Sequence, residues 1–462
     1  MSKWVVTCAA ALCLAGYVFV YATGRAGAPI RSDGFSYYVY LPSWGIFHDT
    51  TLDAVARDCC GGEFPDSTAI IRWPGTGRWV NAHPIGVAVM QAPMFVAAHA
   101  LTKWTNLSPD GFSLYYQHAA GLSGLIWTVF GLLVLRRLLL RHFTDRVTAA
   151  TLLTILFGTS LYHYATFDSS YSHAYSFFLF AAFLDLTERW HCSSAAHAAQ
   201  VRGRLRSSIL LGIVAGLIIL TRHTNVLLLA CFPLYGVTSR ASFTARLEGM
   251  RGEWRPIALM AGIAAVVVAP QLALYYQATG HLLVSSYGAL GFDFASPKVF
   301  GVLFSVQKGL FFWAPVLLLA CAGLAGLARS RHSARAFVTG AALFLIVNTY
   351  VIASWWDWQF GGSYGHRGFV DALPVFAIGL AAFYSWAARR FTRLVPSAIF
   401  VTLAVALSVF QMLQYWNGAL PFSDTTWDQY RAAIFGFNQR DGGREQSPTK
   451  FQHGGLERGS SL

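Results

Sequence analysis

Apolar residues fill most of the chain in long stretches that short polar segments separate. Many of these stretches approach the roughly 20 residues that a helix needs to cross a bilayer. Strand-like alternation of apolar and polar positions is absent, which favours a helical bundle over a membrane barrel. We therefore predict an all-α integral membrane protein with about eleven transmembrane helices, at about 4–22, 112–135, 147–166, 170–187, 207–221, 224–238, 256–276, 309–328, 336–353, 368–388 and 395–415.

One junction interrupts this pattern. The predicted spans 207–221 and 224–238 are short and meet at a polar junction that contains Arg222 and His223. Charged residues inside an apolar stretch indicate a broken hairpin that does not fully cross the bilayer, or a pair of short helices.

The arginines set the orientation. If the N-terminus is cytoplasmic, the loops on that side contain basic clusters, at 136–146, 189–206, 240–255, 329–335 and 389–393. This asymmetry obeys the positive-inside rule. Counting the apolar run at 84–102 as a further span would place these clusters outside. We therefore interpret that run as an interfacial helix within a long external loop, residues 23–111.

Three regions follow from this topology. Residues 1–240 form a first transmembrane module with the external loop 23–111, and residues 241–415 form a second with external loops 277–308 and 354–367. Residues 416–462 form an external tail, whose polar, glycine-containing end predicts at least partial flexibility. The apolar run after Lys3 exceeds a usual signal-peptide core and no clean cleavage site follows it, so we expect an uncleaved first span.

Composition supports the membrane assignment. Hydrophobic residues make up 55% of the 462 residues and charged residues 12%, with a net charge of +13. In a soluble protein this charge would suggest nucleic acid as a partner. Here the basic residues lie mostly in short loops between spans, so we interpret them as topology signals and expect no nucleic acid. Of the seven cysteines, Cys59 and Cys60 are adjacent in the external loop, and no role is predicted for them.

The first candidate for chemistry is Asp33, about eleven residues after the first span. The carboxylate is followed by Gly34, expected to supply a turn, and by the paired tyrosines Tyr37 and Tyr38. Tyrosines suit a headgroup boundary, and we predict that these two bind substrate. We predict Asp33 as a catalytic residue that meets the polar head of a lipid-linked substrate. The alternative is a turn-forming or helix-capping aspartate.

A second group of polar residues lies at the predicted external ends of later spans. Asp168 sits between two spans with almost no loop, and it is the second catalytic candidate or an N-cap. His173 is either a hydrogen-bonded structural residue or part of a phosphate site. Arg222 and His223 lie outside the cytoplasmic leaflet, so the positive-inside rule does not account for them. A buried cation requires an anion, which a lipid phosphate, Asp168 or Asp33 would supply.

The loop 354–367 combines three tryptophans with glycines and ends on a His-Arg pair. An interfacial aromatic belt explains the tryptophans but not the glycines or the cations. We predict that this loop binds substrate, with arginine suited to a phosphate and aromatic faces suited to a sugar; the residues are Trp356, Asp357, His366 and Arg367. Lys308, at the mouth of a span, either snorkels to the interface or meets the phosphate.

The layout resembles the GT-C membrane glycosyltransferases, particularly the branch with the aminoarabinose lipid A transferase and the protein O-mannosyltransferases. Asp33-Gly34-Phe35-Ser36-Tyr37-Tyr38 is similar to the family's segment with the catalytic base, and Asp168 matches its second acidic position. His83-Pro84-Ile85-Gly86 resembles the start of its interfacial helix, and Leu220-Thr221-Arg222 resembles the basic residue at its broken helix pair.

This resemblance covers residues 1–240. Beyond them, Gly-Gly-Ser-Tyr-Gly-His-Arg at 361–367 is similar to a segment of bacterial predicted sugar transferases. The chain departs from the family after the last span, where only about 46 residues follow. We therefore expect acceptor recognition to come from the loops or from a partner.

The resemblance implies an inverting glycosyltransferase with a polyprenyl-phosphate sugar donor, a periplasmic active site and a bacterial inner-membrane location. The acceptor is a lipid, a glycan or a protein, and membrane lipids surround the chain. No cofactor is required for such a reaction, although an oxygen-ligated divalent cation at Asp33 and Asp168 stays open. The alternatives are a flippase or transporter of lipid-linked sugars, and a non-catalytic lipid-binding subunit of the same fold.

Overall fold

The computed structural model describes residues 1–192, 198–284 and 291–436. Its elements are α1 (Ser2–Ala22), α2 (Asp33–Tyr38), α3 (Tyr40–Gly45), α4 (Asp53–Cys60), β1 (Ile70–Arg72), β2 (Trp79–Asn81), α5 (Gly86–Thr102), α6 (Leu114–Leu140), α7 (Asp145–Phe157), α8 (Leu161–Thr166), α9 (Ser172–Cys192), α10 (Ala198–Thr221), η1 (His223–Cys231), α11 (Arg240–Gly252), α12 (Trp254–Thr279), α13 (Val299–Phe304), α14 (Leu310–Trp313), α15 (Val316–Ala328), η2 (Ser333–Phe337), α16 (Val338–Ser354), η3 (Arg367–Phe369), α17 (Leu373–Ala387), α18 (Phe391–Trp416) and α19 (Trp427–Phe435), where η denotes a 3-10 helix.

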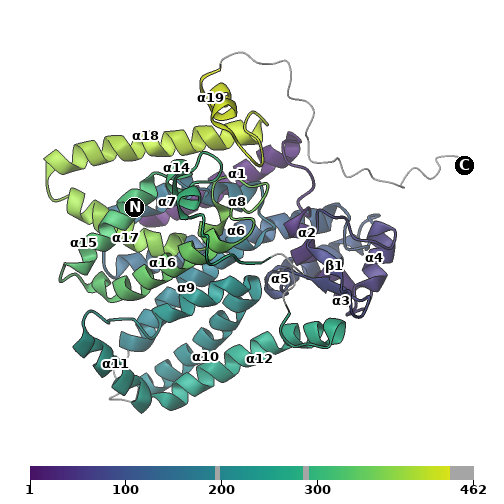
Figure 1. Cartoon of the computed structure of the whole chain (residues 1–462), viewed down its shortest axis with the longest axis horizontal. Coiled ribbons are helices and arrows are strands. Elements are labelled where there is room, and N and C mark those ends of the chain that lie inside the picture. The colour runs from purple at the N-terminus through teal and green to yellow at the C-terminus, as the bar shows by residue number, and fades with distance from the viewer. Residues whose placement is uncertain (193–197, 285–290, 437–462) are drawn as a thin grey trace, which may run out of the picture.

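The helices form one bundle with a cap of shorter elements at one end. The most extensive helix pairs are α6 with α9, α10 with α12, and α15 with α17. The elements of the first loop, α2 to α5 with the two strands, gather at one end of this bundle (Figure 1). Helix α11 lies at the opposite end of α10 and α12 (Figure 1).

The membrane-helical fold is confirmed. Within the described residues, six helices are long and apolar enough to cross a membrane, in α1, α6, α10, α12, η2–α16 and α18, and α5, α15 and α17 are shorter apolar helices. Some predicted spans are divided: 147–166 consists of α7 and α8, and 309–328 consists of α14 and α15. The number of spans stays a prediction.

The predicted interruption near residue 222 is observed. Helix α10 ends at Thr221, and the 3-10 helix η1 follows from His223 to Cys231. This nine-residue element is too short to cross a bilayer, for which about 20 residues are needed. The segment 224–238 is therefore the short half of a broken pair.

The first loop contains helices, as predicted, and also a small hairpin that the sequence did not predict. Strands β1 and β2 pair antiparallel over three residues each, which is too short for an alternating pattern to be recognised. Cys59 and Cys60 form a disulfide with each other at the end of α4. Of the predicted external tail, α19 is described, and residues 437–462 lie outside the described part of the chain.

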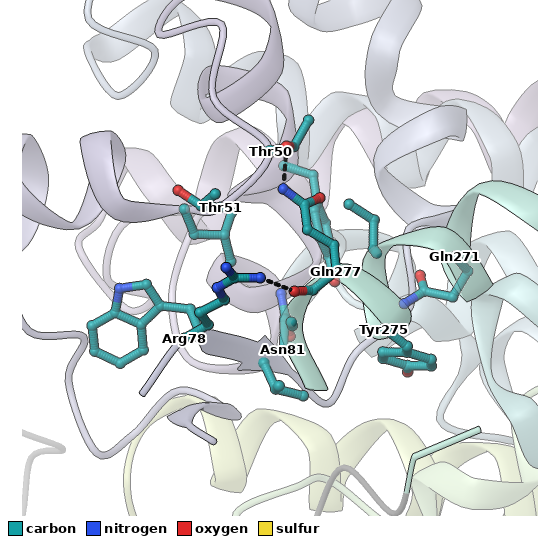
Figure 2. A pocket seen from close by; sticks show the side chains of 13 residues that line it. Thr50, Thr51, Arg78, Asn81, Gln271, Tyr275 and Gln277 are labelled. Atoms are coloured by element: carbon teal, nitrogen blue, oxygen red, sulfur yellow. Dashed lines mark hydrogen bonds between the residues drawn. The ribbon is translucent and has the colours of Figure 1, made fainter. Parts of the chain in front are cut away.

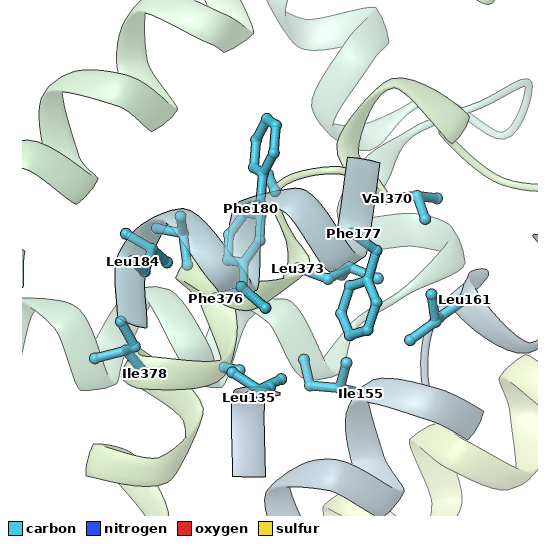
Figure 3. Packing of buried hydrophobic residues seen from close by; sticks show 14 of the residues in the cluster. Leu135, Ile155, Leu161, Phe177, Phe180, Leu184, Val370, Leu373, Phe376 and Ile378 are labelled. Carbon is cyan, nitrogen blue, oxygen red and sulfur yellow. The ribbon is translucent and has the colours of Figure 1, made fainter. Parts of the chain in front are cut away.

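Helix α9 forms the centre of the main hydrophobic core. Phe177 and Phe180 of α9 pack among apolar side chains of α6, α7 and α17 (Figure 3). Nearly every residue of α9 is buried, so this helix is surrounded by protein on all sides.

A buried carboxylate fixes α9 at the end remote from the first loop. Asp185 accepts hydrogen bonds from Arg137 (2.5 Å), Arg141 (2.8 Å) and Arg189 (3.0 Å). Three guanidinium groups compensate the cost of burying this charge. Arginines that the sequence presents as topology signals therefore also connect α6 to α9.

Glycines allow the closest helix contact of the second module. At the crossing of α15 and α17, a Cβ added at Gly323 would lie 1.8 Å from the Gly379 carbonyl oxygen. On the same helix, a Cβ at Gly326 would meet nothing within 4 Å. Gly323 and Gly326 lie on the same helix, and only Gly323 has no room for a side chain.

We expect Gly323→Ala to destabilise the protein by about 1–3 kcal/mol, because α15 and α17 must separate to admit the methyl group. Thermal unfolding of the purified protein in detergent measures this. Gly326→Ala is the control, and we expect it to be neutral or slightly stabilising because alanine is the better helix former. Equal unfolding temperatures for the two variants would contradict the close contact.

Candidate functional site

Asp33 begins helix α2, directly after a strained residue. Ser32 has φ +46° and ψ −128° and makes no side-chain capping bond to the helix. Such a backbone conformation costs of order 1–3 kcal/mol in a residue with a side chain, and it persists only where the surroundings impose it. The Asp33 side chain turns away from a capping role and toward Arg367.

Gly34 serves close packing rather than a turn, so the predicted turn at this residue is wrong. Gly34 lies within α2, and a Cβ at this position would be 2.2 Å from the Ser170 hydroxyl. The absence of a side chain lets α2 lie directly against the 168–172 turn. Asp33 and Asp168 are thereby brought to the same end of the bundle.

The centre of the site is an ion pair between the first loop and a much later one. Arg367 Nη1 donates to Asp33 Oδ2 at 2.7 Å. The rings of Tyr171 and Phe360 each lie 5.9 Å from the Arg367 guanidinium carbon. Phe360 has φ +59° and precedes Gly361 with φ +58°, so strained backbone flanks the pair on both sides.

Charges around Asp33 keep it ionised. Burial alone would raise the pKa of Asp33, but the charge and the hydrogen bond of Arg367 oppose burial, and the pKa lies below its ordinary value. Arg367 responds in the opposite sense, since Asp33 raises its pKa despite burial. Both groups are therefore charged at neutral pH.

A second acid, Asp371, gathers two of the predicted residues. His173 Nδ1 lies 2.9 Å from Asp371 Oδ1, and Arg222 Nη1 donates to Asp371 Oδ2 at 3.2 Å. The Arg222 guanidinium carbon also lies 5.1 Å from the centre of the Phe360 ring. The sequence analysis missed Asp371 because it falls inside the predicted span 368–388, although an acid in a span is itself a functional signal.

Asp168 is held in a third cluster. Arg31 Nη2 donates to Asp168 Oδ1 at 2.7 Å, and His163 Nε2 lies 2.8 Å from Asp168 Oδ2. Trp416 Nε1 donates to His163 Nδ1 at 2.9 Å. An indole nitrogen is only a donor, so the His163 proton is on Nε2 and points to Asp168. Helix α9 begins at Ser172, so Asp168 does not cap it.

Burial alone would raise the pKa of Asp168. Arg31 and His163 outweigh that effect and hold it at about 2. Arg31 and His163 were not among the predicted site residues. No local pattern relates either residue to Asp168, and only the folded chain brings the three together.

The two predicted tyrosines are buried. Tyr38 donates its hydroxyl to the Gly111 carbonyl oxygen at 2.5 Å. Tyr37 packs its ring 4.3 Å from that of His83. Burial, aided by nearby positive charges, lowers the pKa of His83 to about 4, so this histidine is neutral. Of the two tyrosines, Tyr37 is the one that acts on the pKa of Arg367, the partner of Asp33.

Lys308 does not snorkel to the interface, and its contact with a phosphate stays a prediction. It is buried, and its ammonium group donates to the backbone carbonyls of Ser363 and Phe422, the latter at 2.7 Å. Burial and the charge of Arg367 lower the pKa of Lys308 to about 7. Lys308 thus fastens the 361–367 segment to the residues after α18.

Among the predicted site residues, His366 is the one for which the neighbouring residues suggest no structural role. It is buried, and within the described residues neither ring nitrogen has a hydrogen-bond partner. Burial and the nearby cations lower the pKa of His366 to about 3. It lines a small hollow together with Ser160, Trp313 and Tyr364.

The remaining predicted residues lie toward the outside. Trp356 is exposed and Asp357 is partly exposed. His223 is exposed, and its Nε2 lies 3.0 Å from the Tyr275 hydroxyl. Among the described residues, no three His, Cys, Asp or Glu side chains gather as the ligands of a metal ion would.

Comparison with known proteins finds a similarity in fold but none in sequence. At the sequence level, no family model and no curated protein matches the chain. The archaeal oligosaccharyltransferase AglB from Archaeoglobus fulgidus, in complex with an inhibitory peptide and a dolichol-phosphate, matches with a TM-score of 0.50 and 11% sequence identity. The apo form of the Archaeoglobus fulgidus oligosaccharyltransferase matches with a TM-score of 0.51 and 12% identity.

The chain has a GT-C-like fold. Both matches cover 97% of this chain, so the likeness extends past residue 240, where the sequence resemblance ended. The chain spans 61% and 62% of the length of these two proteins.

Replacement of Asp168 is expected to damage the fold. Asp168→Ala leaves Arg31 and His163 without their shared acceptor, and breaking a buried pair costs about 3–5 kcal/mol. Because the Asp168 pKa lies below its ordinary value in the folded state, its stabilising effect is full above about pH 4 and is lost as the pH falls toward 2.

Thermal unfolding from pH 7 down to pH 2 measures both effects. We expect Asp168→Ala to unfold at a lower temperature at pH 7, with a smaller further loss on acidification than wild type. Asp66→Ala, an exposed acid of the first loop, is the control. A wild-type unfolding temperature for Asp168→Ala would contradict the structural role of this ion pair.

Proposed function

We propose that the protein is an inverting glycosyltransferase of the periplasmic face of a bacterial inner membrane. It moves a sugar from a polyprenyl-phosphate donor to a lipid, glycan or protein acceptor, with Asp33 as general base. The observation that carries this proposal is that Asp33 retains a free oxygen. Its Oδ2 pairs with Arg367, while Oδ1 makes no hydrogen bond within the described residues.

The two other acids of the site lack this freedom. Asp168 and Asp371 each engage both carboxylate oxygens with a cation and a histidine. Their side chains are 8% and 3% exposed, against 25% for Asp33. A general base must reach the proton that it removes, so Asp33 is the carboxylate fitted to react. Asp168 and Asp371 position the cations and loops around it.

The proposed reaction is a single displacement. The acceptor hydroxyl gives its proton to Asp33 as its oxygen attacks the anomeric carbon of the donor. The bond from that carbon to the phosphate oxygen breaks, and its electron pair leaves with the polyprenyl phosphate. Attack opposite to the leaving group inverts the anomeric configuration.

Arginines next to Asp33 would stabilise the leaving phosphate. Arg367 and Arg222 both contact the Phe360 ring, so one strained loop residue holds the two cations. Phosphate oxygens would compete with Asp33 for Arg367, since guanidinium groups bind phosphate bidentately. His366 precedes Arg367 and would present its unpaired ring nitrogens nearby. These cations supply charge to the leaving group, so the proposal includes no obligatory cofactor.

The fold supports a lipid-phosphate donor. The archaeal oligosaccharyltransferase of similar fold was solved with a dolichol-phosphate and an inhibitory peptide. A polyprenyl phosphate shares the chemistry of that lipid, a phosphate on a long isoprenoid chain.

The decisive variant is Asp33→Asn. It keeps the size of the side chain but removes the base, so we expect transfer of labelled sugar to fall by about 10²–10⁴-fold. Transfer is measured with purified protein and a panel of radiolabelled polyprenyl-phosphate sugars. Asp66→Asn, an exposed acid of the same loop, is the matched control and should keep wild-type transfer.

Wild-type turnover by Asp33→Asn would rule out Asp33 as the base. Movement of the labelled lipid across a vesicle membrane, without transfer by either protein, would favour the flippase reading. Donor binding with neither transfer nor movement would favour a non-catalytic lipid-binding subunit.

Arg367→Gln tests the phosphate role. We expect a higher KM for the donor, because a phosphate ligand is lost. We also expect the acid limb of the pH–rate profile to move to higher pH, because the Arg367 charge that lowers the pKa of Asp33 is gone. Arg367→Lys keeps the charge and should shift the limb less. An unmoved acid limb in Arg367→Gln would show that Asp33 does not govern the rate.

A further inference from the structure

Helix α12 has different surroundings at its two ends. Next to the first loop, Gln277 Nε2 donates to the Thr50 hydroxyl at 3.0 Å, and Arg78 Nη1 donates to the Gln277 carbonyl oxygen at 2.5 Å (Figure 2). The space left between these walls is about 30 Å³, which is room for little more than water. At its other end α12 meets α11 (Figure 1), and a larger hollow lies between these two helices.

The hollow between α11 and α12 is apolar and open to the outside. Its volume is about 460 Å³, within the range of about 300–1,000 Å³ that is usual for ligand pockets. Apart from Arg251, the residues that line it are apolar, and the largest are Leu247 and Met250 of α11 and Trp254 and Ile257 of α12. Trp254 is 60% exposed, so the described part of the chain does not cover this surface.

Helix α11 has an apolar stripe that no protein core covers. Phe243, Leu247 and Met250 follow one another at intervals of four and three residues, so they share one face of the helix. No residue of this 13-residue helix is buried. Helices shorter than about 12–15 residues are marginal in water without a packed apolar face. The stripe therefore needs an apolar environment outside the protein.

Polar contacts hold α11 against the bundle. Arg246 Nη1 of α11 donates to His191 Nδ1 of α9 at 2.6 Å. Glu253, at the junction of α11 and α12, pairs with Arg204 of α10. The two helices that form the hollow are thus fixed to the rest of the fold, and the hollow is a built feature.

Two unpaired cations border the hollow. Arg251 lines it, and the guanidinium carbon of Arg255 lies 5.5 Å from the centre of the Trp254 ring. Both arginines are exposed, and within the described residues neither makes an ion pair. Residues 240–255 contain four arginines and two glutamates, and one of these acids, Glu253, is already paired. The local charge therefore favours an anionic ligand.

An apolar hollow bordered by unpaired cations fits a lipid with an anionic head. Helix α12 is long and apolar enough to cross a membrane, and tryptophan, here Trp254 at its start, is typical of the headgroup level. A helix with arginines on its polar face and large apolar residues on the other lies in the membrane interface. Basic pockets between helices at this level bind anionic lipid head groups.

We propose that α11 lies in the membrane interface and that the hollow binds one anionic phospholipid. An acyl chain fills the hollow beside Trp254, and the headgroup phosphate binds Arg251 and Arg255. The arginines of 240–255, predicted as topology signals, thus also select a lipid. This inference does not rest on the proposed transferase function, because α11 lies at the end of the bundle opposite the first loop, which carries Asp33 (Figure 1).

Native mass spectrometry of the purified protein in a neutral detergent tests the site. The protein is titrated with phosphatidylglycerol or phosphatidylcholine of the same acyl chains, and the Kd of the first bound lipid is measured. We expect wild type to bind phosphatidylglycerol more tightly. The double variant Arg251→Gln, Arg255→Gln should weaken phosphatidylglycerol by about 30-fold, about fivefold for each charge, and leave phosphatidylcholine unchanged.

The double variant Arg389→Gln, Arg390→Gln is the matched control, because it removes two exposed arginines from another basic loop, outside the hollow. It should bind phosphatidylglycerol as wild type does. Ala261→Phe keeps both cations but places a ring in the hollow, at an exposed position that tolerates it, and should also weaken phosphatidylglycerol.

Three results would overturn the proposal. Equal affinity of wild type for the two lipids, or equal weakening by the two arginine pairs, would show attraction by net charge alone. Tighter binding of a polyprenyl phosphate than of phosphatidylglycerol, lost in Arg251→Gln, Arg255→Gln, would assign the hollow to another lipid. A dimer that the same variant dissociates would assign this surface to a second copy of the chain.

Discussion

The structure depends on the pairing of buried carboxylates with arginines from distant parts of the chain. An ionised carboxylate in a poorly solvated site is costly unless a cation and hydrogen bonds compensate it. Three such pairs lie at one end of the bundle: Asp33 with Arg367, Asp168 with Arg31, and Asp371 with Arg222. The first joins residues 334 positions apart. These pairs determine how the first loop and the loop before α17 close over the helices.

Glycines at the points of closest contact make that closure possible. A Cβ at Gly124 of α6 would lie 1.7 Å from the Ser169 carbonyl oxygen, and one at Gly34 would lie 2.2 Å from the Ser170 hydroxyl. The turn after Asp168 is therefore clamped between α2 and α6. On the other side, a Cβ at Gly86 would lie 2.5 Å from the Leu220 carbonyl carbon, which brings α5 against the end of α10. Close packing of this kind fixes Asp33 more firmly than a free loop would.

The sequence predicts the local and the periodic parts of this arrangement well. Long apolar runs predict the helical membrane fold, and the polar junction at Arg222 predicts the end of α10. The pairing partners are not predictable in this way, because no local pattern relates Asp33 to Arg367 or Asp168 to Arg31. Gly34 was assigned to a turn for the same reason: a glycine that admits a neighbour from 136 positions away looks like any other glycine in the sequence. Asp371 was hidden by the apolar run around it.

Under the proposed function, the same electrostatics would let Arg367 exchange Asp33 for the donor phosphate. Without a donor, Asp33 and Arg367 neutralise each other, which preserves both charges at the cost of their desolvation. A phosphate offers Arg367 an equivalent anion, so the exchange replaces one charge-assisted pair by another and need not be costly. Asp33 would then lose the cation that lowers its pKa and become the stronger base when the donor is in place. We expect no such exchange of partners at Asp168 and Asp371, because each of these carboxylates is also held by a histidine. The single tether on Asp33 would thus distinguish the proposed base from the two carboxylates that are held at both oxygens.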